Sequence, residues 1–151
     1  AIFFFFLTYE IPSQISNRVG EAKGELVGGN LSILYSLLGS KSSIDTRGKI
    51  LYIEDLDEYL YHIDRMLQNL KRNGYFNDLK GLIVGGMTDM HDNSIPFGLD
   101  VVGIINDVVK EFNFPVCFDF PAGHVKDNRA LKLGQEISLK VTSEKVSVTF
   151  L

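Results

Sequence analysis

Short apolar segments alternate with longer segments in which apolar residues recur at helical spacing, and this alternation runs from residue 25 to residue 118. Apolar runs of four to eight residues are typical of buried strands, and recurrence every three or four residues is typical of helices. The patterns predict strands at 25–27, 49–53, 79–84 and 116–118 and helices at 31–38, 59–73 and 100–112. Strands that alternate with helices pack as a parallel sheet, so the chain is expected to have an α/β fold.

The end of the chain follows a different pattern. Segments 136–141 and 145–150 alternate apolar and polar residues and are joined by Thr142-Ser143-Glu144. This pattern predicts a β-hairpin, which adds antiparallel strands to the parallel sheet. Segment 10–23 is rich in turn formers and is expected to be a connector. The opening run Ala1–Leu7 is apolar throughout and is expected to be a buried strand of a chain that continues upstream.

The composition is typical of a globular domain. The 151 residues are 45% hydrophobic and 23% charged, which fits a single domain over 1–151. A formal charge of −4 argues against binding to nucleic acid, which requires clustered basic residues. The opening apolar run is too short for a membrane helix of about 20 residues, so no membrane partner is expected. The single cysteine, Cys117, lies in an apolar run and is expected to be a buried small residue.

A glycine-rich turn, Gly28-Gly29-Asn30, opens directly onto the first expected helix. The glycines permit positive φ, Asn30 is a good N-cap, and Gly39 supplies the stop. Neither phosphate-loop pattern, G-x-G-x-x-G or G-x-x-x-x-G-K-[ST], occurs in the chain. The turn therefore predicts close approach of backbone to another part of the molecule, not a nucleotide site.

Glu54 ends the expected strand 49–53. In open parallel sheets, ligands and catalytic groups gather at the carboxyl ends of the strands, and Glu54 is a candidate for such a group. The alternative is that Glu54 belongs to a solvated helix N-terminus, where carboxylates interact favourably with the helix dipole. Three more acids follow it and make this alternative attractive, namely Asp55, Asp57 and Glu58.

His124 follows Gly123 in the loop after strand 116–118, and an accessible loop histidine is suited to acid–base chemistry. The alternative is an ordinary loop histidine without a catalytic role. His62, inside a helix, and His91, in a turn, are expected to be partly exposed polar residues. The three histidines lack the spacing of a zinc site, so no metal or cofactor is expected. A divalent cation at Asp89, His91 and Asp92 is the alternative.

A serine nucleophile requires a strained turn such as G-x-S-x-G, which exposes its oxygen beside oxyanion donors. None of the serines in this chain lies in such a setting. A complete catalytic triad is therefore not encoded here.

Four motifs in order resemble the C-terminal domain of the LD-carboxypeptidases, also called murein tetrapeptide carboxypeptidases. They are Gly24–Ser32, Gly48–Asp55, Tyr61–Leu67, and Gly123-His124 with Asn128. The resemblance covers residues 20–134. It implies a three-layer β/β/α domain of the swivelling type.

The resemblance also implies that the catalytic residues come from two domains. In the family, a serine on a separate N-terminal domain works with a glutamate and a histidine from the C-terminal domain. The matching positions here are Glu54, which would orient the imidazole, and His124, which would act as the base. Asn30 would help to line the cleft. The implied reaction is metal-free hydrolysis of the amide bond to the terminal D-alanine of cytoplasmic muropeptides during cell-wall recycling.

Because the nucleophile domain is absent, this chain alone is expected to be inactive. It would be a domain of a longer enzyme, or a chain that acts with a separate partner. Two other functions stay open: a non-catalytic peptide-binding or dimerisation module, and hydrolysis of microcin-like peptide nucleotides. A homodimer is possible, because an apolar surface not covered by the other domain favours self-association.

Overall fold

The computed structural model describes residues 6–151, which form three helices and seven strands. The helices are α1 (Leu31–Leu37), α2 (Leu60–Arg72) and α3 (Val101–Val109). The strands are β1 (Thr8–Pro12), β2 (Gly20–Asn30), β3 (Ile50–Leu56), β4 (Gly81–Thr88), β5 (Val116–Cys117), β6 (Glu136–Val141) and β7 (Lys145–Phe150). The mixture of helices and strands confirms the α/β class.

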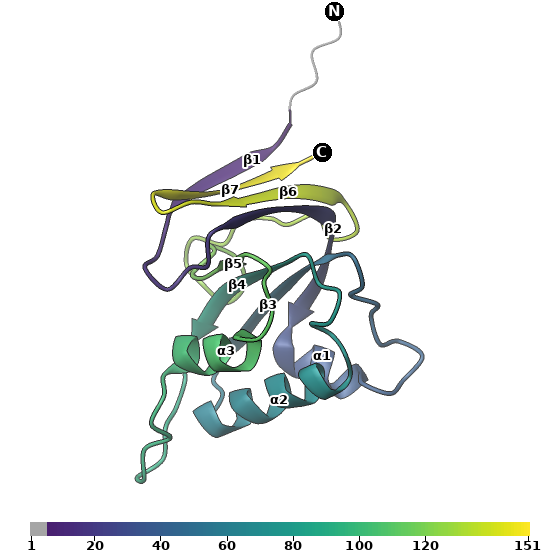
Figure 1. Ribbon diagram of the computed structural model, residues 1–151. Helices are drawn as coiled ribbons and strands as arrows, with labels where there is room; N and C mark the ends of the chain where they lie inside the picture. Colours follow the sequence, from purple (N-terminus) through teal and green to yellow (C-terminus); the bar gives the residue numbers. More distant parts are fainter. Residues whose placement is uncertain (1–5) are drawn as a thin grey trace, which may run out of the picture.

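The strands follow the order β1-β7-β6-β2-β3-β4-β5. Strands β2 to β5 are parallel, and β1, β7 and β6 are antiparallel. The long strand β2 belongs to both parts: Gly20–Glu25 pairs with β6, and Leu26–Asn30 pairs with β3. The antiparallel part lies over one face of the parallel part, and the helices lie against the other face (Figure 1). The three-layer β/β/α arrangement expected from the resemblance is therefore confirmed.

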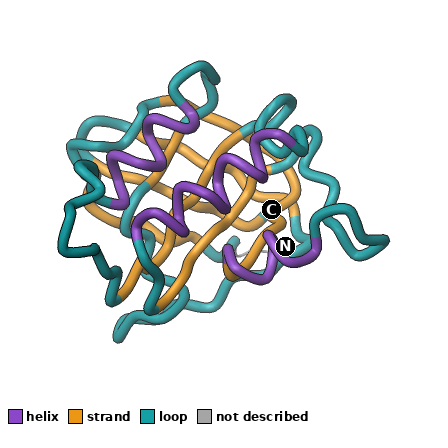
Figure 2. The backbone as a smooth tube through the Cα atoms, turned by 90° about the horizontal axis from the view of Figure 1, so that it is seen from below, coloured by secondary structure: helices purple, strands orange, loops and turns teal. Residues whose placement is uncertain are grey.

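Two hydrophobic cores separate the three layers. Strand β3 contributes to both, because successive residues point to opposite faces of a sheet. Leu51 and Ile53 pack with the helices, and Ile50 and Tyr52 pack with the antiparallel strands. Burial on both faces explains why β3 reads as a continuous apolar run. Figure 2 shows the helices lying across one face of the strands.

The connector expected at 10–23 is wrong in part, because β1 and the first residues of β2 fall within it. Strand β1 is an edge strand whose partner, β7, lies at the other end of the chain. Only Ile11 of β1 is buried, so the segment lacks the apolar alternation that marks a strand. Of the apolar opening run, residues 1–5 lie outside the described part. Phe6 and Leu7 are exposed and precede β1, so the buried strand expected there is wrong for these two residues.

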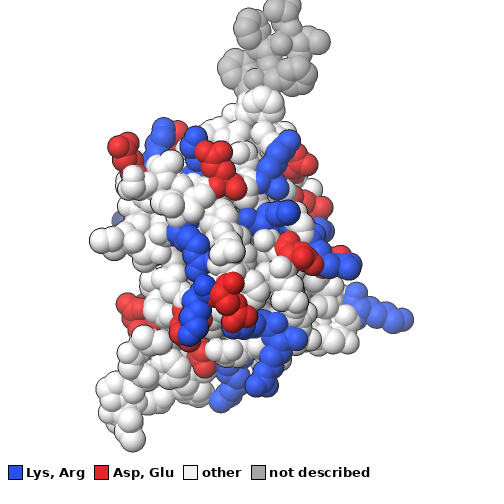
Figure 3. Space-filling view, viewed as in Figure 1, with Lys and Arg blue, Asp and Glu red and all other residues white. Residues whose placement is uncertain are grey.

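Charged side chains of both signs intersperse on the surface drawn in Figure 3. Exposed ion pairs such as Lys23 with Glu136 and Lys145 with Glu10 connect side chains of neighbouring strands. Within residues 6–151, the helices are too short or too polar to cross a membrane.

Candidate active site

Glu54 and His124, which lie 70 residues apart in the chain, are in direct contact. Nδ1 of His124 lies 2.7 Å from Oε2 of Glu54, and the backbone N–H of His124 donates to the same oxygen at 3.2 Å. The Glu54 side chain is 7% exposed, whereas that of His124 is 52% exposed. Within residues 6–151, no group pairs with the other ring nitrogen, Nε2. The pair is therefore a buried carboxylate holding an accessible imidazole.

Glycines allow the loop that carries His124 to approach the sheet this closely. Gly123 has φ +98°, and a Cβ there would lie 2.6 Å from Oε2 of Glu54. A Cβ at Gly85 of β4 would lie 2.5 Å from the carbonyl oxygen of Ala122. The backbone N–H of Gly86 donates to that same oxygen at 2.9 Å. The loop therefore rests directly on the carboxyl ends of β3 and β4.

Two further side chains hold the His124 loop in place. Oγ1 of Thr88 donates to the carbonyl oxygen of His124 at 2.7 Å. Oδ1 of Asn128 accepts from the backbone N–H of Gly123 at 3.0 Å. The backbone on both sides of the imidazole is thus fixed before any ligand binds, which is the arrangement that precise acid–base chemistry requires.

This geometry suits His124 to accept a proton from outside the chain. Because a carboxylate can only accept a hydrogen bond, Nδ1 carries the ring hydrogen and the lone pair is on Nε2. The buried carboxylate would stabilise the imidazolium that forms when Nε2 takes a proton. The charge of Glu54 also acts on Tyr52: burial and, secondarily, this charge raise the pKa of the Tyr52 phenol well above its ordinary value.

Asn30 caps α1, as expected: its Oδ1 accepts from the backbone N–H of Ile33 at 3.1 Å. Its Nδ2 donates to Oδ1 of Asp55 at 2.9 Å. Asn30 is also the register partner of Glu54 on the adjacent parallel strand. It therefore lies at the edge of the sheet that carries the Glu54–His124 pair. Lining of a cleft by Asn30 stays a prediction.

The run of acids after residue 53 does not cap α2, so that alternative is wrong. Helix α2 has Tyr59 as its N-cap, no side-chain capping bond, and no acid in its first turn. Glu54 and Asp55 instead belong to β3 and are both buried. The other two acids pair with the two remaining histidines, Asp57 with His91 and Glu58 with His62.

Two other kinds of site, a metal site and a nucleophilic cysteine, are not formed in the part of the chain that the structure describes. Among these residues, no group of three or more His, Cys, Asp or Glu side chains is placed to hold a metal ion. The alternative cation site at Asp89, His91 and Asp92 is therefore not formed there. Cys117 is completely buried, and burial together with the charge of Asp119 raises the pKa of its thiol to about 12. Its thiol is not available as a nucleophile.

The sequence of residues 23–139 matches the family model of the LD-carboxypeptidase C-terminal domain. The chain belongs to the LD-carboxypeptidase family. The match includes Asn30, Glu54 and His124.

This LD-carboxypeptidase domain has relatives with two kinds of name. It is 41% identical over 133 residues to a probable murein peptide carboxypeptidase from Bacillus subtilis, with 85% of this chain and 40% of that protein aligned. It is 26% identical over 138 residues to the microcin C7 self-immunity protein MccF from Escherichia coli, with 86% of this chain and 38% of that protein aligned. The chain thus spans about two fifths of the length of these relatives.

The fold of this LD-carboxypeptidase domain is likewise found in solved structures. The crystal structure of muramoyltetrapeptide carboxypeptidase from Oxalobacter formigenes superposes with a TM-score of 0.87 at 27% identity, covering 96% of this chain and 50% of that one. The three-layer arrangement is therefore shared with that structure.

Proposed function

We propose that this chain supplies the general base and its orienting carboxylate to a serine-type LD-carboxypeptidase. The observation that carries the proposal is the 2.7 Å contact between His124 Nδ1 and Glu54 Oε2, which leaves Nε2 free. A serine hydroxyl from a separate N-terminal domain would give its proton to Nε2 as it attacks the peptide carbonyl. His124 would then pass the proton to the leaving amine, while Glu54 keeps the tautomer and stabilises the imidazolium.

The proposed substrate is a muropeptide that ends in D-alanine. The names of the relatives, murein peptide carboxypeptidase and muramoyltetrapeptide carboxypeptidase, support this substrate class. The bond cleaved would be the amide between an L-centre and the terminal D-alanine, in the cytoplasmic recycling of the cell wall. Asn30, at the same sheet edge as Glu54, would line the substrate cleft.

A second candidate function has the same hydrolytic chemistry and a different substrate. The similarity to MccF favours a peptide nucleotide of the microcin type. Assays of D-alanine release and of peptide-nucleotide hydrolysis on the same preparation distinguish the two. Tight peptide binding without turnover would instead support a non-catalytic binding module.

The proposal is tested by replacing His124 with alanine in the protein that also carries the serine domain. We expect kcat for release of D-alanine to fall by roughly three orders of magnitude or more, because removal of a triad base has effects of this size. His91→Ala is the matched control, since His91 also pairs with a carboxylate, that of Asp57, but contacts neither Glu54 nor His124. Near-normal turnover in His124→Ala would remove the proposed base.

A further inference from the structure

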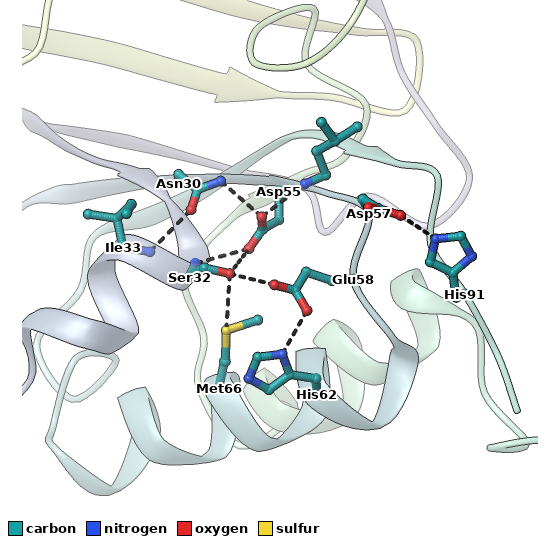
Figure 4. Close-up of polar contacts among 10 residues, drawn as sticks. Asn30, Ser32, Ile33, Asp55, Asp57, Glu58, His62, Met66 and His91 are labelled. Atoms are coloured by element: carbon teal, nitrogen blue, oxygen red, sulfur yellow. Dashed lines mark hydrogen bonds and ion pairs between the residues drawn. The ribbon is translucent and has the colours of Figure 1, made fainter.

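A second buried carboxylate, Asp55, lies next to Glu54 in β3 and is the centre of a separate polar network (Figure 4). The residue is 3% exposed. Its oxygens accept four hydrogen bonds, from Asn30 Nδ2 (2.9 Å), the Ser32 backbone N–H (2.9 Å), Ser32 Oγ (2.8 Å) and the Leu56 backbone N–H (2.9 Å). Four donors saturate the lone pairs of a carboxylate, so Asp55 has no capacity left for a ligand.

The network extends from Asp55 to helix α2. Oγ of Ser32 also lies 2.9 Å from Oε1 of Glu58, whose other oxygen lies 2.7 Å from Nδ1 of His62. These three residues include the types found in a catalytic triad, but the Ser32 hydroxyl contacts the Glu58 carboxylate and not the His62 imidazole (Figure 4). The Ser32 hydroxyl has a single hydrogen and is shared between two carboxylates. Ser32 is therefore a structural link between α1, β3 and α2, not a nucleophile.

What Asp55 controls is the orientation of the Asn30 amide. The oxygen of that amide is fixed because it caps α1 through the Ile33 N–H. The nitrogen is fixed because it faces the acceptor-only carboxylate of Asp55. An amide nitrogen carries two hydrogens, and within residues 6–151 Asp55 is the one acceptor that Nδ2 has. One N–H hydrogen of Asn30 is thus left for a ligand.

The position of this free hydrogen matters because Asn30 and Glu54 are register partners at the carboxyl end of the parallel sheet. Consecutive residues of β3 act on its two sides: Glu54 holds His124, and Asp55 holds Asn30. We propose that Asp55 is a positioning residue, which orients the Asn30 amide so that its second N–H hydrogen bonds the peptide substrate. This role rests on the proposed function, because it requires a peptide bound beside Glu54.

Asp55→Ala, in the protein that also carries the serine domain, tests the role. Alanine removes the carboxylate that accepts from Asn30 Nδ2, so Asn30 keeps its cap on Ile33 but loses the contact that orients its nitrogen. We expect KM for the D-alanine peptide to rise about tenfold with kcat within about twofold, because uniform binding is lost and the Glu54–His124 pair is not touched. A purely structural role would lower the folded fraction, and with it the apparent kcat, at unchanged KM.

Thr46→Val is the matched control for stability. Thr46 is buried, and its hydroxyl donates to the Tyr75 carbonyl oxygen at 2.8 Å without contacting the site. We expect this variant to lower the melting temperature and to leave KM unchanged. If Asp55→Ala behaves in the same way, Asp55 has no positioning role.

A double variant that combines Asn30→Asp with Asp55→Asn separates orientation from the donated hydrogen. The carboxylate introduced at position 30 would keep the cap, and the amide introduced at position 55 would donate to it, so the hydrogen bond returns with its direction reversed. We expect the melting temperature to recover while KM stays high, because a carboxylate has no N–H to give the substrate. Recovery of KM together with the melting temperature would overturn the proposal.

Side-chain amide exchange provides a readout that does not depend on activity. In the ¹⁵N-labelled protein, we expect one Asn30 amide hydrogen to exchange slowly and the other rapidly, and the slow one to be lost in Asp55→Ala. Two equally rapid hydrogens in the parent would overturn the orientation itself. If the slow and fast pair is observed but no peptide is hydrolysed, the orientation by Asp55 stands, and the proposed function and the substrate contact of Asn30 are both wrong.

Discussion

At the scale of single residues, burial determines the chemistry of Cys117. Its thiol has a pKa raised to about 12 from 9.0, because the thiolate would be buried in an apolar core beside the charge of Asp119. In the unfolded chain the thiol ionises near its ordinary pKa. From about pH 9 to pH 12 the folded state therefore binds the extra proton, and stability falls as pH rises.

This shift predicts a measurable loss of stability in alkali. Between pH 8 and pH 10, we expect Cys117 to contribute roughly 1 kcal/mol to the fall in the free energy of unfolding. The measurement is denaturant unfolding of the wild type and of Cys117→Ala at both pH values. The variant should lose less stability over this interval than the wild type, and equal losses would contradict the assigned burial of the thiol.

The residues of the candidate site differ in how far local sequence could predict them. The Asn30 cap follows from its place before a helical pattern and is confirmed. Glu54 and His124 were paired by the resemblance alone, since a strand-end acid and a loop histidine have no local signal that joins them across 70 residues. Asp55 had no distinguishing signal either: three of its four donors, those of Asn30 and Ser32, come together with it only after β2 and β3 have paired.

At the scale of elements, the contact between the 122–125 loop and the end of β3 depends on Gly123. Gly123→Ala would place a Cβ 2.6 Å from Glu54 Oε2 in a backbone conformation with φ +98°. We expect a loss of about 1–2 kcal/mol from the positive φ and a further 1–3 kcal/mol from the clash, with displacement of His124 and a lower kcat.

Gly98→Ala is the matched control for this prediction. Gly98 has nearly the same φ, +95°, but a Cβ there would meet nothing within 4 Å. Thermal unfolding of both variants separates backbone strain from the collision with Glu54. Equal losses of stability would show that the loop can move away from Glu54 at no cost.

The elements themselves were predicted well where a pattern is local. The three helices, the strands β3 and β4 and the β6–β7 hairpin all arise from apolar periodicity and from stops such as Gly74. Strand β1 and the first half of β2 were missed because their pairing with β7 and β6 is between distant segments. Their exposed faces leave little apolar alternation to detect.

At the scale of the whole molecule, the three-layer fold explains why Glu54 and His124 come into contact. Glu54 lies at the carboxyl end of the parallel strands, and residues of β3 pack into the hydrophobic core on each side of the sheet. The loop after β5 crosses those ends and places His124 against Glu54. The alcohol that would complete the site is expected on the part of the relatives that this chain does not span.

The central claim is that Glu54 and His124 act as one catalytic unit, and a double-mutant cycle tests it most directly. The measurement is kcat for D-alanine release by the protein with its serine domain, carrying Glu54→Gln, His124→Ala or both. Residues that act as a unit give strongly non-additive losses. We predict that the double variant is no slower than His124→Ala alone; losses that multiply would contradict the account.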